Sequence, residues 1–289
     1  MKKYNIKNDI YNLTVSDHGA EITSLLKNGK ELMWNADPAF WGRTSPVLFP
    51  QVGAVWEKKF RHDGKTYEMG QHGFARDMDF KMISQTSDEL VFELRDNEET
   101  LAKYPFSFVL RLGYKITDDG VEVIWEVENP SDSDMFFSIG GHPAFNCDLN
   151  KDKLLFMNKG NKVSGNLVSD VIMPDGSGCL SDKTKEVVLE DGVLALKPEL
   201  FDEDALVIEN RQADSVAIIS ADGENLLTVS FDAPLFGVWS PDHKNAPFVC
   251  IEPWYGRCDR AGFAGDLSER EYGNKLGAGE KFRVSYTIA

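Results

Sequence analysis

Three side chains of this sequence, those of two histidines and one glutamate, stand in settings that suit proton transfer. His142 lies in the segment Gly140–Asn146, where two glycines precede it and a proline follows it. Glycine allows a close approach of the backbone, and proline fixes the chain beyond the histidine. The unperturbed pKa of histidine is roughly 6.5, so a rigidly held imidazole can exchange a proton near neutral pH. The segment also fits a loop histidine that makes only a structural hydrogen bond.

His72 repeats the context of His142, because it also stands beside glycine at an expected strand edge. It lies in the segment Gly70–Arg76, with an arginine four residues after the histidine. The other three histidines occupy polar or turn segments and are interpreted as exposed loop residues. They are His18, His62 and His243.

Glu252 is the carboxylate whose setting differs most from a solvated surface charge. It follows the apolar strand 248–251 and precedes a proline and Trp254. Burial raises the pKa of a carboxyl group, whereas a neighbouring arginine or histidine lowers it. The alternative is a structural ion pair with Arg257 or Arg260.

The combination of His72, His142 and Glu252 suits acid–base chemistry on a neutral polar ligand. Aromatic faces can stack on the C–H face of a sugar while carboxylates and arginines bind its hydroxyls. The aromatic candidates are Trp254, Phe74 and Phe145.

The same two histidines and glutamate could instead ligate a metal as a facial triad. The wide separation of His72 and His142 along the chain argues against this alternative, because metal-binding histidines often come as closely spaced pairs. The sequence contains neither a Walker-type phosphate loop nor the serine elbow of the hydrolases.

The composition limits the partners and the compartment. The formal net charge is −16, which disfavours nucleic acid and anionic membranes, since both require clustered lysine and arginine. The four cysteines form no Cys-x-x-Cys pair and are expected to be small buried thiols. The N-terminus lacks an apolar signal region, and we expect a cytoplasmic protein without membrane segments.

Hairpin signals dominate the chain and predict an all-β fold. Asp-Gly or Asn-Gly pairs favour tight turns between antiparallel strands, because both residues tolerate positive φ. In the run Val121–Glu128, valines and a tryptophan alternate with mainly acidic residues, which is typical of a strand with one buried face. The pairs lie at residues 28–29, 63–64, 119–120, 175–176, 191–192 and 222–223.

Helical patterns are scarce. Residues 97–102 could form a short capped helix, and Glu203 to Leu206 could form a helical turn. The final strand is expected over residues 281–288. With no linker or repeat in the sequence, the simplest prediction is one antiparallel β-sandwich domain over residues 1–289.

Taken together, these segments resemble the aldose 1-epimerase (galactose mutarotase) family, and more closely its LacX-like branch. The resemblance covers essentially the whole chain and depends on the order of its motifs rather than on any one of them. The segments are Gly19–Leu25, Trp41–Pro50, those around His72 and His142, and Cys250–Trp254.

The resemblance implies a single large antiparallel β-supersandwich with few short helices and a sugar cleft on one sheet. It also implies cofactor-free interconversion of the α and β anomers of a hexose, without a metal. His142 resembles the general acid that protonates the ring oxygen, and Glu252 resembles the general base. His72 resembles the histidine that orients the sugar, and Asp204 resembles an acidic residue that binds its hydroxyls.

The chain departs from the family at one position. Gly53 is followed by Ala54, where the family often has a sugar-binding arginine, and Arg43 or Arg76 is expected to replace it. Near pH 7 the mechanism requires one protonated and one ionised group. We expect a protonated His142 and an anionic Glu252, each stabilised by the charge of the other.

Three alternatives remain open from the sequence. The first is a hexose-6-phosphate mutarotase, for which Lys58, Lys59 and Arg257 also offer positive charge. The second is a non-catalytic carbohydrate-binding or regulatory protein on the same scaffold, and the third is the metalloenzyme. In all cases a small molecule is the expected partner, and the protein is expected to be a monomer or a homodimer.

Overall fold

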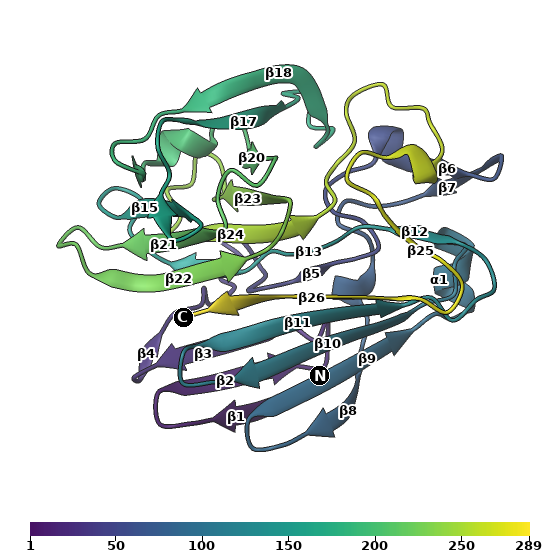
Figure 1. Cartoon of the computed structure of the whole chain (residues 1–289), viewed down its shortest axis with the longest axis horizontal. Helices are drawn as coiled ribbons and strands as arrows, with labels where there is room; N and C mark the ends of the chain where they lie inside the picture. Colours follow the sequence, from purple (N-terminus) through teal and green to yellow (C-terminus); the bar gives the residue numbers. More distant parts are fainter.

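Antiparallel pairing of strands builds most of the structure, a computed structural model that describes residues 1–289. Two large sheets form separate layers, and a four-stranded N-terminal sheet lies beside the lower layer in Figure 1. The architecture is an all-β sandwich of antiparallel sheets, as expected.

The ten-stranded sheet contains the long meander that the hairpin signals predict. Its strands are β8 (Lys81–Gln85), β9 (Glu89–Arg95), β10 (Val109–Ile116), β11 (Val121–Glu128), β15 (Lys153–Asn158), β16 (Asn161–Lys162), β19 (Val193–Ala195), β21 (Ser215–Ile219), β22 (Asn225–Phe231) and β26 (Lys281–Ile288). The last strand has the bounds expected from the sequence.

The eight-stranded sheet carries the residues of chemical interest. Its strands are β5 (Val47–Leu48), β13 (Ile139–Gly141), β14 (Ala144–Asn146), β17 (Leu167–Ile172), β18 (Leu180–Val187), β20 (Leu206–Ile208), β23 (Leu235–Trp239) and β24 (Phe248–Tyr255).

The remaining elements are short. The four-stranded sheet contains β1 (Lys3–Lys7), β2 (Tyr11–Ser16), β3 (Ile22–Lys27) and β4 (Lys30–Glu31), and two ribbons pair β6 (Lys59–His62) with β7 (Lys65–Glu68) and β12 (Met135–Phe137) with β25 (Asn274–Leu276). The helices are α1 (Glu98–Lys103) and the 3₁₀ turns η1 (Trp56–Lys58), η2 (Ala75–Asp77), η3 (Pro198–Phe201) and η4 (Leu267–Glu269). None of these helices is both long and apolar enough to cross a bilayer.

Most of the predicted turns are confirmed, and one hairpin is wrong. The Asp-Gly pairs at 63–64, 119–120 and 222–223 join β6 to β7, β10 to β11 and β21 to β22. The turn at 191–192 forms and is bridged by Glu190 and Val193, but the predicted hairpin extends no further, because β19 pairs with β15 and not with β18. The strands on either side of this turn belong to different sheets, so the local signal could not predict their partners.

The predicted helix is confirmed, whereas the predicted helical turn is displaced. The side chain of Asn97 caps α1 by accepting a hydrogen bond from the backbone N–H of Thr100 at 2.9 Å. The predicted turn from Glu203 to Leu206 is wrong. The helical turn η3 lies before these residues, and Leu206 already begins β20.

The strand β24 connects the core to the site. All eight of its residues are buried. Because successive side chains point to opposite faces of a strand, Val249 and Ile251 enter the main core, whereas Cys250, Glu252 and Trp254 face the other way. The prediction that Glu252 ends the strand is wrong, since β24 continues to Tyr255. Glu252 thus lies inside β24, with strand residues both before and after it in the sequence.

Candidate active site

His142 lies between two short strands that flank β24. β13 ends at Gly141, β14 begins at Ala144, and the backbone N–H of His142 donates to Pro46 at 3.0 Å. The preceding glycines permit close packing rather than a turn. A Cβ on Gly140 would lie 2.6 Å from the Trp254 ring, so this glycine allows the tryptophan to lie against β13.

His142 and Glu252 face each other inside the protein. The distance from His142 Nδ1 to Glu252 Oε1 is 3.4 Å, and the two residues are 7% and 1% exposed. No arginine pairs with Glu252, because Arg257 binds Glu209 and Glu271 while Arg260 binds Asp170. The alternative of a structural ion pair for Glu252 with either arginine is therefore wrong.

Burial acts in opposite directions on the two groups. It lowers the pKa of His142 to about 3, an effect that the nearby Arg76 strengthens. It raises the pKa of Glu252 well above its ordinary value, partly opposed by the Trp254 indole. Burial thus favours a neutral imidazole facing a protonated carboxyl group, which is the opposite of the charge distribution expected from the sequence.

His72 approaches the same point from a turn rather than from the expected strand edge. Its backbone φ is +66°, and its ring centroid lies 5.6 Å from that of His142. The backbone N–H of Gly53 donates to His72 Nδ1 at 3.1 Å, so the proton of the neutral ring resides on Nε2. Burial and the neighbouring His142 lower the pKa of His72 well below its usual range. His72 is therefore a neutral hydrogen-bond donor through Nε2.

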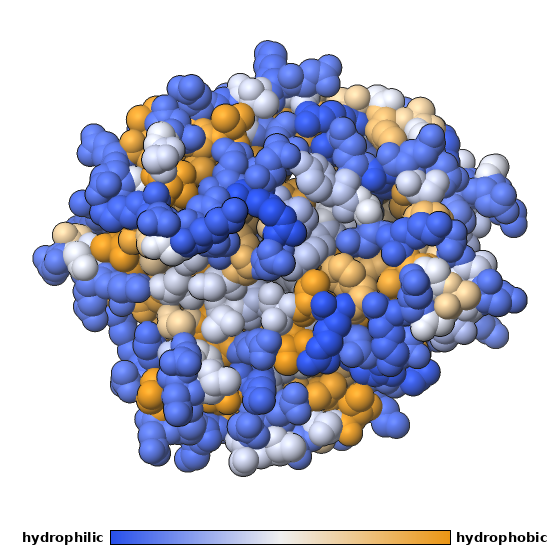
Figure 2. Space-filling model, viewed as in Figure 1, coloured by the Kyte–Doolittle hydropathy of each residue, from blue (hydrophilic) through white to orange (hydrophobic).

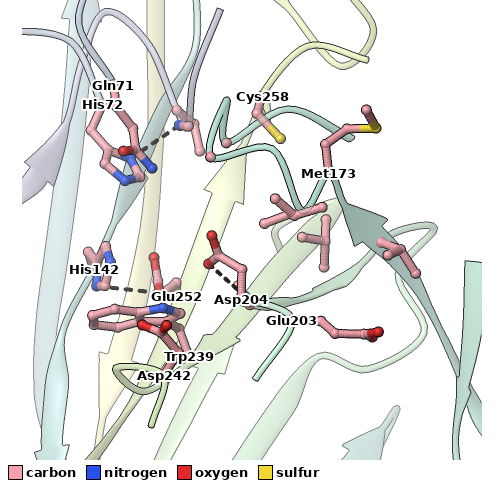
Figure 3. Close-up of a pocket in the computed structure, with 18 of the residues that line it drawn as sticks. Gln71, His72, His142, Met173, Glu203, Asp204, Trp239, Asp242, Glu252 and Cys258 are labelled. Carbon is pink, nitrogen blue, oxygen red and sulfur yellow. Dashed lines mark hydrogen bonds and ion pairs between the residues drawn. The ribbon is translucent and has the colours of Figure 1, made fainter. Parts of the chain in front are cut away.

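All seven site residues predicted from the sequence line one pocket of about 1150 Å³, which Figure 3 shows in part. They are Arg43, His72, Arg76, His142, Asp204, Glu252 and Trp254. The protein has four buried side-chain polar atoms without a hydrogen-bond partner, and all four belong to this lining. They are Arg76 Nε, His142 Nδ1, Glu252 Oε2 and Trp254 Nε1. Such a concentration of unpaired polar atoms is expected where a polar ligand binds.

The two candidate arginines differ in their partners. Arg43 donates to Asp77 at 2.7 Å, whereas Arg76 donates to the Gln71 carbonyl at 2.9 Å, and its Nε makes no hydrogen bond but lies 3.7 Å from the Asp77 carboxylate. Arg76 thus has the freer guanidinium for a ligand hydroxyl. Asp204 lies on the opposite wall with a backbone φ of +72°, and burial raises its pKa.

Two tryptophans of the site were missed by sequence reasoning. The Trp41 ring stacks on His142 with centroids 4.6 Å apart, and Trp239 meets the same imidazole edge-on at 5.3 Å. Trp41 lies two residues before Arg43 in a segment already singled out, so its position carried a signal. Trp239 at the end of β23 carried none.

Two aromatic residues expected to stack on a sugar do not reach the pocket. Phe145 is fully buried in the main core, and Phe74 packs on Tyr104 and Phe108. Phe145 pairs with Val249 in the register of β14 and β24, so its side chain enters the core with that residue. Nearness in sequence to His142 and His72 did not reveal this orientation.

The remaining histidines lie outside the pocket lining. His62 is not a loop residue as expected, because it ends β6, packs on Phe106 and faces Asp266 at 3.3 Å. His18 and His243 face aspartates on the surface.

The side chains that could bind a metal differ from the triad considered above. The ligand atoms of His142, Cys250 and Glu252 lie within 4.8 Å of one another. His72 does not belong to this group. All four cysteines are free thiols, as expected, and only Cys147 is partly exposed.

Comparison with known proteins agrees with this fold. A sequence profile of the aldose 1-epimerase family matches residues 2–286. The chain therefore belongs to this family of isomerases that act on carbohydrates.

Several individual proteins resemble the chain along most of its length. The chromosomal LacX protein of Lactococcus lactis subsp. lactis is 29% identical over 262 residues, which cover 87% of each chain. A galactose mutarotase related enzyme from Lactobacillus acidophilus has a TM-score of 0.92 and 35% identity, with 100% of this chain and 97% of that chain covered. A galactose mutarotase-like protein from Lactobacillus casei has the same TM-score at 30% identity, with 99% of each chain covered.

Proposed function

We propose that this protein is an aldose 1-epimerase that interconverts the α and β anomers of a neutral hexose through His142 and Glu252. The observation that carries the proposal is the buried pair of His142 and Glu252 at one end of the pocket, where Nδ1 lies 3.4 Å from Oε1 and where Nδ1 and Oε2 have no hydrogen-bond partner. Family membership supports the reaction class, and the relatives named as galactose mutarotase-like support a hexose.

The reaction requires two coupled proton transfers. The base removes the proton of the anomeric hydroxyl, the acid protonates the ring oxygen, and the bond from C1 to the ring oxygen breaks. Rotation about the C1–C2 bond and ring closure on the other face of the aldehyde complete the exchange. Because the reverse reaction uses the same steps, each catalytic group acts as acid in one direction and as base in the other.

The neutral pair is compatible with these roles. A neutral His142 beside a protonated Glu252 holds as many protons as the charged distribution expected from the sequence. Moving one proton between Nδ1 and Oε1, which are 3.4 Å apart, interconverts the two states. In either state, one member of the pair can donate a proton and the other has a lone pair that can accept one. In the neutral state the pair adds no charge to the pocket when the sugar enters.

The other lining residues orient the sugar. His72 donates from Nε2, Arg76 donates from its unpaired Nε, and Asp204 accepts hydroxyl protons from the opposite wall. Trp41 stacks on the His142 ring and Trp239 packs edge-on against it, and these contacts hold its Nδ1 toward Glu252. Each well-placed acid or base typically contributes about 10²–10⁴-fold, which is sufficient for a reaction that already proceeds in water.

Polarimetry on freshly dissolved α-glucose and α-galactose tests the proposal. We expect the purified protein to accelerate the change in optical rotation well above the rate in buffer. A rate equal to that of buffer for both sugars and for a wider panel of aldoses would contradict it. Calorimetric sugar binding without acceleration would instead support the non-catalytic alternative, which the alanine at position 54 keeps open.

A phosphorylated hexose is the less favoured substrate because the pocket has no excess of positive charge. Its lining contains two arginines and two lysines against five carboxyl groups. Lys58, Lys59 and Arg257, which could have bound a phosphate, do not line it. Competition between glucose and glucose-6-phosphate separates the substrates, and we expect the phosphorylated sugar to inhibit only weakly.

A further inference from the structure

The pocket continues well beyond the pair formed by His142 and Glu252. In Figure 3 these two residues lie at one end, Asp204 lies beyond them, and Met173 and Glu203 lie on the far side. The whole pocket has a volume of about 1150 Å³. Pockets for drug-sized ligands measure roughly 300–1,000 Å³, and a hexose is smaller than most such ligands. A single hexose at the catalytic end leaves the far part unfilled.

We propose that this far part is a second sugar subsite, so that the preferred substrate is a reducing disaccharide or short oligosaccharide rather than a free hexose. This inference rests on the proposed function, because only a sugar with a free anomeric carbon can mutarotate. That carbon must face His142 and Glu252. The second sugar must therefore be attached through a hydroxyl on the opposite side of the ring, toward Asp204.

The far wall has the mixed chemistry that a neutral saccharide requires. The hairpin of β17 and β18 provides apolar contacts from Ile172 and Met173 for the C–H face of a sugar. The same hairpin provides the Thr184 hydroxyl and the Lys183 amine, and neither group has a hydrogen-bond or ion-pair partner within the protein. Lys185 Nζ lies 3.0 Å from Glu203 Oε2, so the charges of these two residues offset each other. The wall therefore offers hydrogen-bond donors and acceptors rather than a large net charge.

The hairpin is anchored firmly enough to form a fixed wall. At its tip, a Cβ on Gly178 would lie 3.2 Å from that of Ala54, so the tip rests on the loop after Gly53. Along β18, the backbone N–H of Leu180 donates to the backbone carbonyl of Asp259 at 2.8 Å, and Arg260 donates to the Ser181 carbonyl at 2.8 Å. A preformed wall costs little ordering entropy on binding, which favours discrimination between short and long substrates.

Two disaccharides with free anomeric carbons test the inference against the monosaccharide that forms their reducing end. Mutarotation of α-lactose, β-maltose and α-glucose is measured by polarimetry with the purified full-length protein. We expect kcat/KM for at least one disaccharide to exceed that for α-glucose by about ten-fold, which corresponds to one or two additional hydrogen bonds. A value for α-glucose equal to or above both disaccharides overturns the inference.

Variants of the far wall locate the effect. We expect Met173→Ala and Lys183→Ala each to lower kcat/KM for the preferred disaccharide by about five-fold and to change that for α-glucose less than two-fold. Asp182→Ala is the matched control, because this exposed residue lies on β18 outside the pocket lining and should affect neither sugar. Equal losses on both sugars would mean that the wall contributes only to folding and would refute the subsite.

Failure of the inference and failure of the proposed function have different signatures. Methyl β-lactoside cannot mutarotate, but it can fill both subsites. Its calorimetric binding, compared with that of methyl β-glucoside, reports the second subsite without turnover. Tighter binding of the lactoside with no mutarotation of any sugar would refute the proposed catalytic function and leave the second subsite standing. Mutarotation of glucose with equal binding of both glycosides, and no preference for either disaccharide, would refute only the subsite.

Discussion

At the scale of single residues, the unpaired atoms of His142 and Glu252 are costly in the absence of a ligand. A buried polar group without a hydrogen-bond partner costs about 1–3 kcal/mol. The protein tolerates this at His142 Nδ1 and Glu252 Oε2, both of which a sugar with its hydroxyls and ring oxygen can satisfy. Folding therefore already bears the cost of burying these polar atoms, and a sugar that hydrogen-bonds to them gains binding free energy by relieving it.

The pH dependence of kcat/KM should follow the opposite shifts of these two groups. As the pH falls, a second proton binds the pair and removes the base, and the lowered pKa of His142, about 3, places this loss far below neutrality. As the pH rises, the pair loses its last proton and the acid, and the raised pKa of Glu252 moves this loss upward. We expect a broad plateau whose two limbs belong to the coupled pair.

The measurement is polarimetry across the pH range, with the catalysis by buffer subtracted at each pH. An acid limb near the ordinary histidine pKa of roughly 6.5 would contradict this expectation.

Removal of either member of the pair should abolish most of the activity. We expect His142→Ala and Glu252→Gln each to lower kcat by at least about 10²-fold, because each removes one of the two proton-exchanging groups. Circular dichroism should show an unchanged fold. Glu252→Gln removes a carboxyl group that no arginine or lysine pairs with, so its urea midpoint should be equal to or above that of the parent. Turnover at the parental rate in both variants would show that the roles are assigned wrongly.

The sequence predicts which residues meet at the site but not how they are protonated. His142, His72 and Glu252 were identifiable because glycine, proline and an apolar strand surround them. The protonation depends on burial beneath Trp41 and Trp239, and these tryptophans are brought to the imidazole only by the tertiary fold. The orientation of Phe145 depends on strand register in the same way.

At the scale of elements, the hairpin of β17 and β18 explains the missing arginine. Ala54 is 5% exposed, and the hairpin tip at Gly178 lies against it. An arginine side chain at position 54 would need the space that this tip occupies. The Arg76 guanidinium, with its unpaired Nε, reaches the pocket from η2 instead.

Restoring the family residue should therefore destabilise the protein. We expect Ala54→Arg to lower the free energy of unfolding by about 1–3 kcal/mol, the usual cost of overpacking, and not to raise activity. Asp182→Arg introduces the same side chain on an exposed position of β18 and should leave stability nearly unchanged. Urea denaturation of both variants measures the difference. A gain in activity with parental stability for Ala54→Arg would contradict the explanation.

Elements that depend on local signals were predictable, and those that depend on distant partners were not. The Asp-Gly turn between β10 and β11 is confirmed because its conformation is set by the two turn residues themselves. The pairing of β19 with β15, and the length of β24, depend on strands far away in the sequence. The wall that the hairpin forms around the pocket is a consequence of the same non-local pairing.

At the scale of the whole molecule, one apolar core joins the sheets. Sixty buried residues form a continuous cluster that includes Leu13 of β2, Phe92 of β9 and Ile251 of β24. The face shown in Figure 2 is largely hydrophilic, with hydrophobic residues in scattered patches, in keeping with the net charge of −16.

This shared core predicts that residues 1–289 unfold as one unit. We expect a single urea transition with the same midpoint by far-ultraviolet and near-ultraviolet circular dichroism. Strand content and aromatic packing are then lost together, since no sheet retains its core without the other. Two separated midpoints would contradict the assignment of one domain.

The packing of tryptophans around His142 has an optical consequence. Trp41, Trp239 and Trp254 line the pocket and make up three of the six tryptophans of the protein. A protonated imidazole quenches the fluorescence of a stacked indole, and a sugar that displaces water from an indole shifts its emission. The intrinsic emission of the protein should therefore report both the ionisation of His142 and the arrival of a sugar. No added probe or coupled reaction is needed, so even a substrate that turns over slowly can be recognised by titration alone.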